Sequence, residues 1–203
     1  CRLFVSQLSE LLSALQVPRA HLVGNSLGGG IVIEFARYFP QRVESLALVA
    51  PVGLRLAKRT YVLTRAPLVP DVLFRCFLQF SLLFGLEYEW ADVKNPKYRT
   101  MVQAYKRRVA EEPALGRSLL STARHFPFEQ LGPAFAAAGD LLRPVLVVWG
   151  DGDRTCPCQA RDVRRLVPRA DVVVVRGARH CVYTEFVGES ARAVVDHLRR
   201  AVA

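Results

Sequence analysis

The chain has 203 residues, of which 51% are hydrophobic, and a formal net charge of +10. This length and apolar content are typical of one well-packed domain and exclude a disordered chain. A basic chain can bind nucleic acid, an anionic membrane or an acidic substrate. Nucleic acid is disfavoured here, because the basic residues do not alternate with aromatic residues as a base-stacking platform requires.

The first part of the chain predicts a helix, a strand and a second helix. Residues 2–16 place leucines on one helical face, and residues 20–24 (AHLVG) form a short apolar strand. The next helix, residues 26–38, ends before Pro40. Residues 43–50 (VESLALVA) are almost all apolar, which is typical of a parallel strand buried on both faces.

The last part of the chain continues this alternation. Strands are predicted at residues 144–150 (PVLVVWG) and 171–177 (DVVVVRG), with a helix at 158–167 between them and a final helix at 185–201. Strands that alternate with helices in this way predict an α/β fold with a doubly wound, mostly parallel sheet.

Residues 51–143 interrupt the alternation with several prolines and short helical segments, and we interpret them as an inserted helical cap between 1–50 and 144–203. The almost entirely apolar stretch 66–86 is too short and too broken by prolines for a membrane-spanning helix. It packs on the sheet, covers an acyl-binding pocket or rests on a membrane surface as an apolar patch. The later part of the cap is basic, which indicates either a solvated helix face or attraction to anionic lipid head groups. Its basic residues are Lys94, Lys97, Arg99, Lys106, Arg107 and Arg108.

Gly24-Asn25-Ser26-Leu27-Gly28 fits the pattern G-x-S-x-G, between a predicted strand and a predicted helix. This context places the serine hydroxyl on a sharp turn. We expect the glycines at 24 and 28 to avoid collisions between the strand and the helix. The amide of Leu27 and the helix N-terminus would face a developing oxyanion. Ser26 is therefore the candidate nucleophile and Leu27 the candidate oxyanion donor.

Two later strands end in residues that complete such a site. Asp151 and Asp153 follow the strand that ends at residue 150, and His180 follows the next strand. The order Ser, Asp, His is one of the known orders of a catalytic triad. Since parallel strands build sites at their common carboxyl edge, we predict a triad of Ser26, one of the two aspartates, and His180.

Three stretches resemble the α/β-hydrolase fold family. LVGNSLGGGIVIEFARYFPQRVESLALVAP is similar to its nucleophile elbow, VVWGDGDRTCP to its acid turn and VVVVRGARHCVYTEF to its histidine turn. The resemblance covers residues 17–50 and 144–200. It implies Asp153 as the acid that orients His180, with His180 as general base and then general acid. It also implies an acyl-enzyme on Ser26 that water hydrolyses.

The chain begins at the helix just ahead of the nucleophile strand, so we expect a truncated α/β-hydrolase core and a fragment of a longer enzyme; a naturally short homologue is the alternative. The strand at 20–24 would then be an exposed edge. The His-Gly-type loop that gives the family its second oxyanion donor is missing from this sequence, and losing one donor typically costs ~10²–10³ in rate. Arg179 replaces the glycine that usually precedes the histidine.

The resemblance favours a serine hydrolase that acts on carboxylic or lipid esters. GNSLGG and the APVGL-like segment are similar to carbon–carbon bond hydrolases of this fold, but Cys181 stands where those enzymes usually have tryptophan. HCVYTE is similar to a lipid-handling branch, with Glu185 where that branch often has aspartate. The alternatives are a carbon–carbon bond hydrolase and a catalytically impaired scaffold or regulatory homologue.

We expect no cofactor and no metal. Cys156, Cys158, His180 and Cys181 could converge, but Cys-x-Cys is poor spacing for zinc, and a metal would compete with the catalytic role of the histidine. The odd number of cysteines, five, favours free thiols and a reducing compartment. We therefore expect a cytoplasmic enzyme of small-molecule or lipid esters, with peripheral membrane contact through the cap and no nucleic-acid partner.

Overall fold

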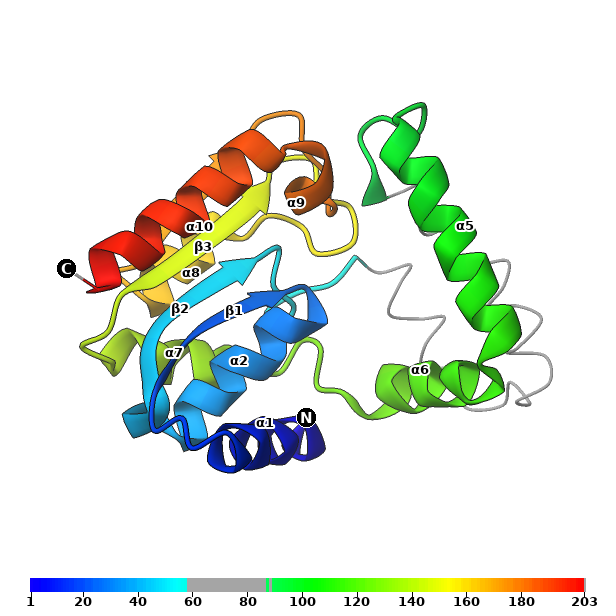
Figure 1. Cartoon of the computed structure of the whole chain (residues 1–203). Helices are drawn as coiled ribbons and strands as arrows, with labels where there is room; N and C mark the ends of the chain where they lie inside the picture. The colour runs from blue at the N-terminus through cyan, green and yellow to red at the C-terminus, as the bar shows by residue number, and fades with distance from the viewer. Residues whose placement is uncertain (58–86, 88, 203) are drawn as a thin grey trace.

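A computed structural model describes residues 1–57, 87 and 89–202 (Figure 1). The predicted apolar stretch 66–86 lies outside the described residues. The elements are α1 (Arg2–Ala14), β1 (Ala20–Asn25), α2 (Leu27–Tyr38), η1 (Pro40–Arg42), β2 (Val43–Val49), α5 (Pro96–Glu111), α6 (Pro113–His125), α7 (Gly132–Asp140), β3 (Val145–Gly150), α8 (Ala160–Leu166), β4 (Asp171–Val175), α9 (Val182–Glu185) and α10 (Val187–Val202).

The sheet of the described residues has four parallel strands in the order β1-β2-β3-β4. In register, Leu22 pairs with Leu46, and Leu48 pairs with Val147. The parallel sheet with intervening helices confirms the predicted α/β class. β1 lies at one edge of the sheet, where Val23 is 51% exposed.

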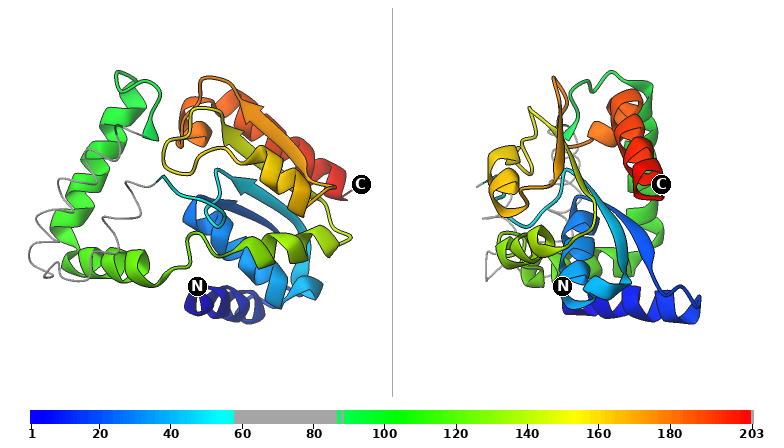
Figure 2. Two further views of the ribbon diagram at one scale, coloured as in Figure 1. Left: turned by 180° about the vertical axis from the view of Figure 1, so that it is seen from behind. Right: turned by 90° about the vertical axis from the view of Figure 1, so that its left-hand side faces the viewer.

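Both faces of the central strands are buried, as their continuous apolar sequence predicted. Leu46 and Leu48 of β2 pack in a core cluster with α2, α7 and α8, whereas Ala47 and Val49 pack in a second cluster under α10. Figure 2 shows α2, α7 and α8 on one side of the sheet and α10 on the other. Because burial of one leucine contributes roughly 1.5–3 kcal/mol, these strands dominate the stability of the fold.

α7 falls within the range 51–143 that the sequence assigned to the cap, but it packs against α2. Ala134, Phe135 and Ala138 of this helix are buried in the same cluster as β2. The cap boundaries remain a prediction, and the end of that range is structurally continuous with the sheet core.

α5 and α6 stand away from the sheet, on the right of Figure 1. We call residues 89–125 the arm. α5 has no buried residue, and the six basic residues predicted for the cap are all exposed. The start of the arm is anchored by Trp90, which is fully buried and contacts the ring of Tyr98 at a centroid distance of 5.6 Å. Within the described residues, no helix is long and apolar enough to cross a membrane.

Candidate active site

Ser26 lies on the turn between β1 and α2 with backbone angles φ 50° and ψ −113°. A positive φ is costly for a non-glycine residue, by about 1–3 kcal/mol, and persists only where the surrounding structure enforces it. Here the Ser26 amide donates to the carbonyl of Val49 at 2.9 Å, and the Val52 amide donates to the Ser26 carbonyl at 3.1 Å. Leu27 is the first residue of α2, so its amide has no acceptor within the helix and is free to serve an oxyanion.

The glycines of the motif have different roles. A Cβ at Gly24 would lie 2.4 Å from the carbonyl oxygen of Gly28, so the strand and the helix touch at this point, as expected. A Cβ at Gly28 would meet no atom of the described residues within 4 Å, and there the expected collision is not found. Gly29 is the second close approach, since its Cβ would lie 2.8 Å from Cβ of Pro51.

The three side chains predicted for the triad are linked by two hydrogen-bond contacts through His180. His180 Nε2 is 2.9 Å from Ser26 Oγ, and His180 Nδ1 is 2.8 Å from Asp153 Oδ2. A carboxylate only accepts hydrogen bonds, so we assign the ring proton to Nδ1. Nε2 is then free to accept the proton of the Ser26 hydroxyl.

Asp153 is fixed by its own turn, and both Asp153 and His180 are only 5% exposed. Its Oδ1 accepts the amides of Thr155 at 2.9 Å and Cys156 at 2.8 Å. Its Oδ2 also accepts Nε1 of Trp149 at 3.3 Å, a contact that the sequence did not reveal. Asp153 is therefore held in one orientation toward the imidazole.

The other candidate acid, Asp151, does not bind His180 in the contacts of the described residues. Its Oδ1 accepts the amide of Gly177 at 2.8 Å on the exposed side of the turn. The structure therefore gives Asp151 a role in connecting the acid turn to the histidine turn.

The acid and histidine turns are packed closely through Gly150, the last residue of β3. A Cβ at this position would lie 2.4 Å from the carbonyl oxygen of Ala178 and 2.5 Å from that of Arg179. The Gly152 amide also donates to the Ala178 carbonyl at 3.0 Å. Gly150 thus permits the approach that brings Asp153 to His180, and the G-D-G-D sequence was the only signal for it.

The charges around His180 set its protonation. Burial lowers the pKa of His180, but the hydrogen bond that His180 donates to Asp153, the charge of Asp153 and the charge of Glu89 together outweigh burial and raise the pKa above its ordinary value. Burial in turn raises the pKa of Glu89, and the charge of His180 partly offsets this. Glu89 comes from the arm, and sequence reasoning missed it. These carboxylates favour the protonated imidazolium form of His180.

The cysteines considered as metal ligands are free thiols in the described part of the chain. Burial raises the pKa of the Cys156 thiol and of the Cys181 thiol. Among the described residues, no three His, Cys, Asp or Glu side chains are grouped closely enough to hold a metal ion.

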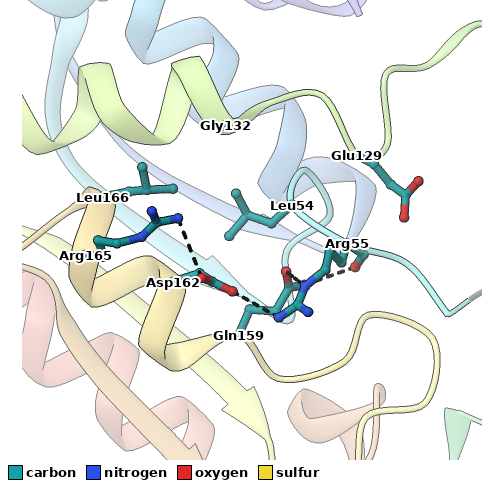
Figure 3. Close-up of a pocket in the computed structure, with 8 residues that line it drawn as sticks. All are labelled: Leu54, Arg55, Glu129, Gly132, Gln159, Asp162, Arg165 and Leu166. Carbon is teal, nitrogen blue, oxygen red and sulfur yellow. Dashed lines mark hydrogen bonds and ion pairs between the residues drawn. The ribbon is translucent and has the colours of Figure 1, made fainter.

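A separate pocket of about 310 Å³ lies between α7, α8 and the segment after β2 (Figure 3). None of the triad residues lines it. Its polar side chains pair with each other: Arg55 Nη2 is 3.0 Å from Asp162 Oδ2, and Arg55 Nε donates to Gln159 Oε1 at 3.2 Å. These paired side chains therefore connect α8 to the residues after β2. The pocket is separate from the site formed by Ser26, Asp153 and His180.

The sequence profile of the alpha/beta hydrolase family matches residues 2–197. The chain is 27% identical over 206 residues to 2-hydroxy-6-oxononadienedioate/2-hydroxy-6-oxononatrienedioate hydrolase of Burkholderia vietnamiensis, covering 95% of this chain and 67% of that protein. It is 26% identical over 201 residues to Lipase 3 of a Moraxella species, covering 96% of this chain and 62% of that protein. The solved structure of a meta-cleavage product hydrolase from Pseudomonas fluorescens IP01 matches with a TM-score of 0.73 and 21% identity, covering 97% of this chain and 71% of that one.

The chain belongs to the alpha/beta hydrolase family. It spans about two thirds of the length of these two curated relatives. The structural match shows a shared fold.

Proposed function

We propose that this chain carries the catalytic residues of a serine hydrolase that cleaves carboxylic or lipid esters through an acyl-enzyme. The observation that carries the proposal is the pair of hydrogen bonds that links the three side chains through His180. Ser26 Oγ lies 2.9 Å from His180 Nε2, and His180 Nδ1 lies 2.8 Å from Asp153 Oδ2. The strained backbone of Ser26 supports it, because such strain is stored at functional sites.

In the acylation step, Ser26 Oγ attacks the ester carbonyl carbon while His180 Nε2 accepts the hydroxyl proton. The negative charge moves to the carbonyl oxygen, which faces the Leu27 amide and the N-terminus of α2. When the tetrahedral intermediate collapses, the bond to the alcohol breaks. His180 Nε2 donates its proton to the departing alkoxide, and the acyl group stays on Ser26.

In the deacylation step, water replaces the alcohol. His180 Nε2 accepts a proton from water as the water oxygen attacks the acyl carbon. Collapse of the second tetrahedral intermediate releases the carboxylic acid and returns the proton to Ser26 Oγ. Throughout, Asp153 holds the Nδ1 proton and stabilises the positive imidazolium.

Lipid esters fit the arm better than small acids do. The exposed basic residues of α5 give the arm a positive charge that attracts anionic head groups, so we propose peripheral contact with a membrane surface. The relationship to Lipase 3 supports a lipid substrate.

Vesicles that contain phosphatidylserine should bind the protein more tightly than phosphatidylcholine vesicles, and Lys106→Glu with Arg107→Glu should abolish the difference. Equal binding to both vesicles would exclude this contact.

A carbon–carbon bond hydrolase is the second candidate, because the Burkholderia vietnamiensis relative is named as a hydrolase of an oxononadienedioate. The same triad could attack an activated ketone. Against it, Glu89 places an acidic group near the histidine, where a dicarboxylate substrate would be repelled. Direct comparison of a p-nitrophenyl ester with a vinylogous diketone separates the two activities.

The deciding experiment is labelling with a fluorophosphonate probe alongside p-nitrophenyl ester turnover. The protein should label, and Ser26→Ala should abolish labelling and lower turnover by about 10⁴-fold or more. Ser6→Ala is the matched control, since Ser6 is an exposed serine on α1 and is not part of the triad. A folded protein that neither labels nor turns over either substrate would refute the enzymatic proposal and favour a non-catalytic scaffold.

A further inference from the structure

The first residues of the arm are bound directly to the turn that carries His180. The clearest contact is made by Glu185, at the end of α9. Its Oε2 accepts the amide of Ala91 at 2.8 Å, and its Oε1 accepts the amide of Asp92 at 2.8 Å. One carboxylate thus holds two consecutive peptide groups, and hydrogen bonds to a charged acceptor are stronger than neutral ones.

Two further contacts lie on either side of the catalytic histidine. The residue before it, Arg179, donates from Nη1 to the carbonyl of Trp90 at 2.7 Å. The residue after it, Cys181, donates its amide to the carbonyl of Glu89 at 3.0 Å. We call these contacts, together with those of Glu185, the latch. The latch therefore restrains the histidine turn immediately before and after the imidazole.

The segment of the arm that the latch binds is also held in place by other contacts. Trp90 is completely buried, and its ring packs edge-on against the ring of Tyr98. Lys97 Nζ adds a contact to the carbonyl of Thr184 at 3.3 Å. By contrast, the histidine turn lies between β4 and the four-residue α9, so little regular structure fixes its backbone.

We propose that Glu185 and Arg179 are positioning residues for the reaction: by binding the backbone of residues 90–92, they keep His180 aligned with Ser26 and Asp153. This inference rests on the proposed function. It gives a physical role to Arg179, where the family usually has glycine, and to Glu185, where the lipid-handling branch often has aspartate.

The number of acceptor oxygens on residue 185 offers a graded test. Glu185→Gln retains one oxygen for two amides, and Glu185→Ala retains none. Glu189→Ala is the matched control, because Glu189 is an exposed acid in the first turn of α10. For Arg179→Ala, the control is Arg176→Ala, an exposed arginine on the strand side of the same turn.

Hydrogen exchange measures the contact without any need for activity. The amides of Ala91, Asp92 and Cys181 should exchange slowly in the wild-type protein. In Glu185→Ala the first two should exchange at least about tenfold faster, because their acceptor is removed. Unchanged exchange in Glu185→Ala, with the fold intact by circular dichroism, would overturn the latch.

Kinetics with two ester lengths separate positioning from simple attachment of the arm. p-Nitrophenyl acetate has a short acyl chain, so its binding should depend less on the arm than the binding of long-chain esters does. If the latch aligns His180, Glu185→Ala should lower kcat for this acetate by about 10-fold with little change in KM, and Glu185→Gln should recover part of it. If the latch only attaches the arm, the acetate kcat stays at the wild-type value and KM rises for long-chain esters alone, which would overturn the proposal.

The Nδ1 proton of His180 gives a readout that does not depend on turnover. Its hydrogen bond to Asp153 should produce a downfield proton resonance, which Asp153→Asn removes and which identifies the signal. Glu185→Ala should broaden or shift this resonance, whereas Glu189→Ala should leave it unchanged.

If the wild-type protein neither labels nor hydrolyses esters, the proposed function fails. The resonance still decides the latch, because an unaltered signal in Glu185→Ala overturns it.

Discussion

The sheet core and the arm are held in place by different forces. In the core, every residue of β3 is buried, and the apolar side chains of β2 and β3 divide between two clusters on opposite faces of the sheet. In the arm, α5 has no buried residue, and the attachment to the histidine turn consists of Trp90 and a few polar contacts. Burial of many side chains fixes the core, whereas the start of the arm is held to the histidine turn by hydrogen bonds beside one buried tryptophan.

The core therefore holds the triad, whereas the exposed surface of the arm can influence which substrates bind. All three triad side chains come from turns at the carboxyl ends of core strands, so their geometry follows from the packing of the sheet. The arm contributes the neighbouring Glu89 and the basic surface of α5. Changes in the core should therefore alter the rate of every substrate, whereas changes to the exposed basic surface of α5 should alter rates selectively.

The largest effect is expected from Asp153→Asn. If the amide oxygen of asparagine accepts the Thr155 and Cys156 amides, its NH₂ group faces His180 Nδ1. The ring proton must then move to Nε2, which can no longer accept the proton of Ser26. We expect kcat to fall by about 10⁴-fold for short and long esters alike.

Asp151→Asn is the control for this prediction, because Asp151 accepts only the Gly177 amide among the described contacts. It should keep nearly full activity. Comparable losses in Asp151→Asn and Asp153→Asn would show that the acid has been assigned to the wrong residue. Loss of activity confined to long-chain esters would contradict the division between core and arm.

Gly150→Ala should lower the stability of the fold. Its new Cβ would lie 2.4 Å from a backbone oxygen, and a backbone atom cannot rotate away as the end of a side chain can. We expect the free energy of unfolding to fall by about 1–3 kcal/mol. Gly152→Ala is the milder companion, since its nearest atom lies at 3.2 Å. Equal urea midpoints for the two variants would contradict the proposed close contact between the acid and histidine turns.

The sequence predicted the core well because its signals are local and periodic. The runs at 43–50 and 144–150 are too apolar for a half-exposed strand, and both became strands buried on two faces. The chain order of serine, aspartate and histidine located the candidate site at the strand ends. The close approach at Gly24 also followed from the motif.

The contacts between the arm and the histidine turn could not be predicted in the same way. Glu185 binds backbone amides 94 and 93 residues away in the chain, and every residue except proline offers such an amide. No sequence pattern therefore identifies the partner. For the same reason, Glu89 gave no signal as a neighbour of His180, and the packing of α7 on α2 was hidden inside the proline-rich range assigned to the cap.

A smaller effect is expected from Glu89→Gln, which removes one of the negative charges that raise the pKa of His180. His180 must be neutral to accept a proton, so kcat/KM should decline as the pH falls through its raised pKa. Without the Glu89 charge this pKa moves down, and the acid limb of the profile shifts to lower pH. Glu87→Gln, an exposed neighbour, should leave the limb in place. A shift to higher pH in Glu89→Gln would contradict the electrostatic role of this carboxylate.

The smallest effect is expected at Gly188, which is exposed in the first turn of α10 and has no described atom within 4 Å of the position of a Cβ. Alanine there should stabilise the helix by about 0.5 kcal/mol, because alanine loses less backbone entropy on folding. For a chain of this size, that gain raises Tm by about 1–2 °C. Since α10 covers one face of the sheet, the gain should appear in the unfolding of the core, measured by calorimetry, while hydrogen exchange in α5 stays unchanged. Slower exchange in α5 would show that the core and the arm unfold as one unit, and the contrast between burial and hydrogen bonding would then not describe two independently stable regions.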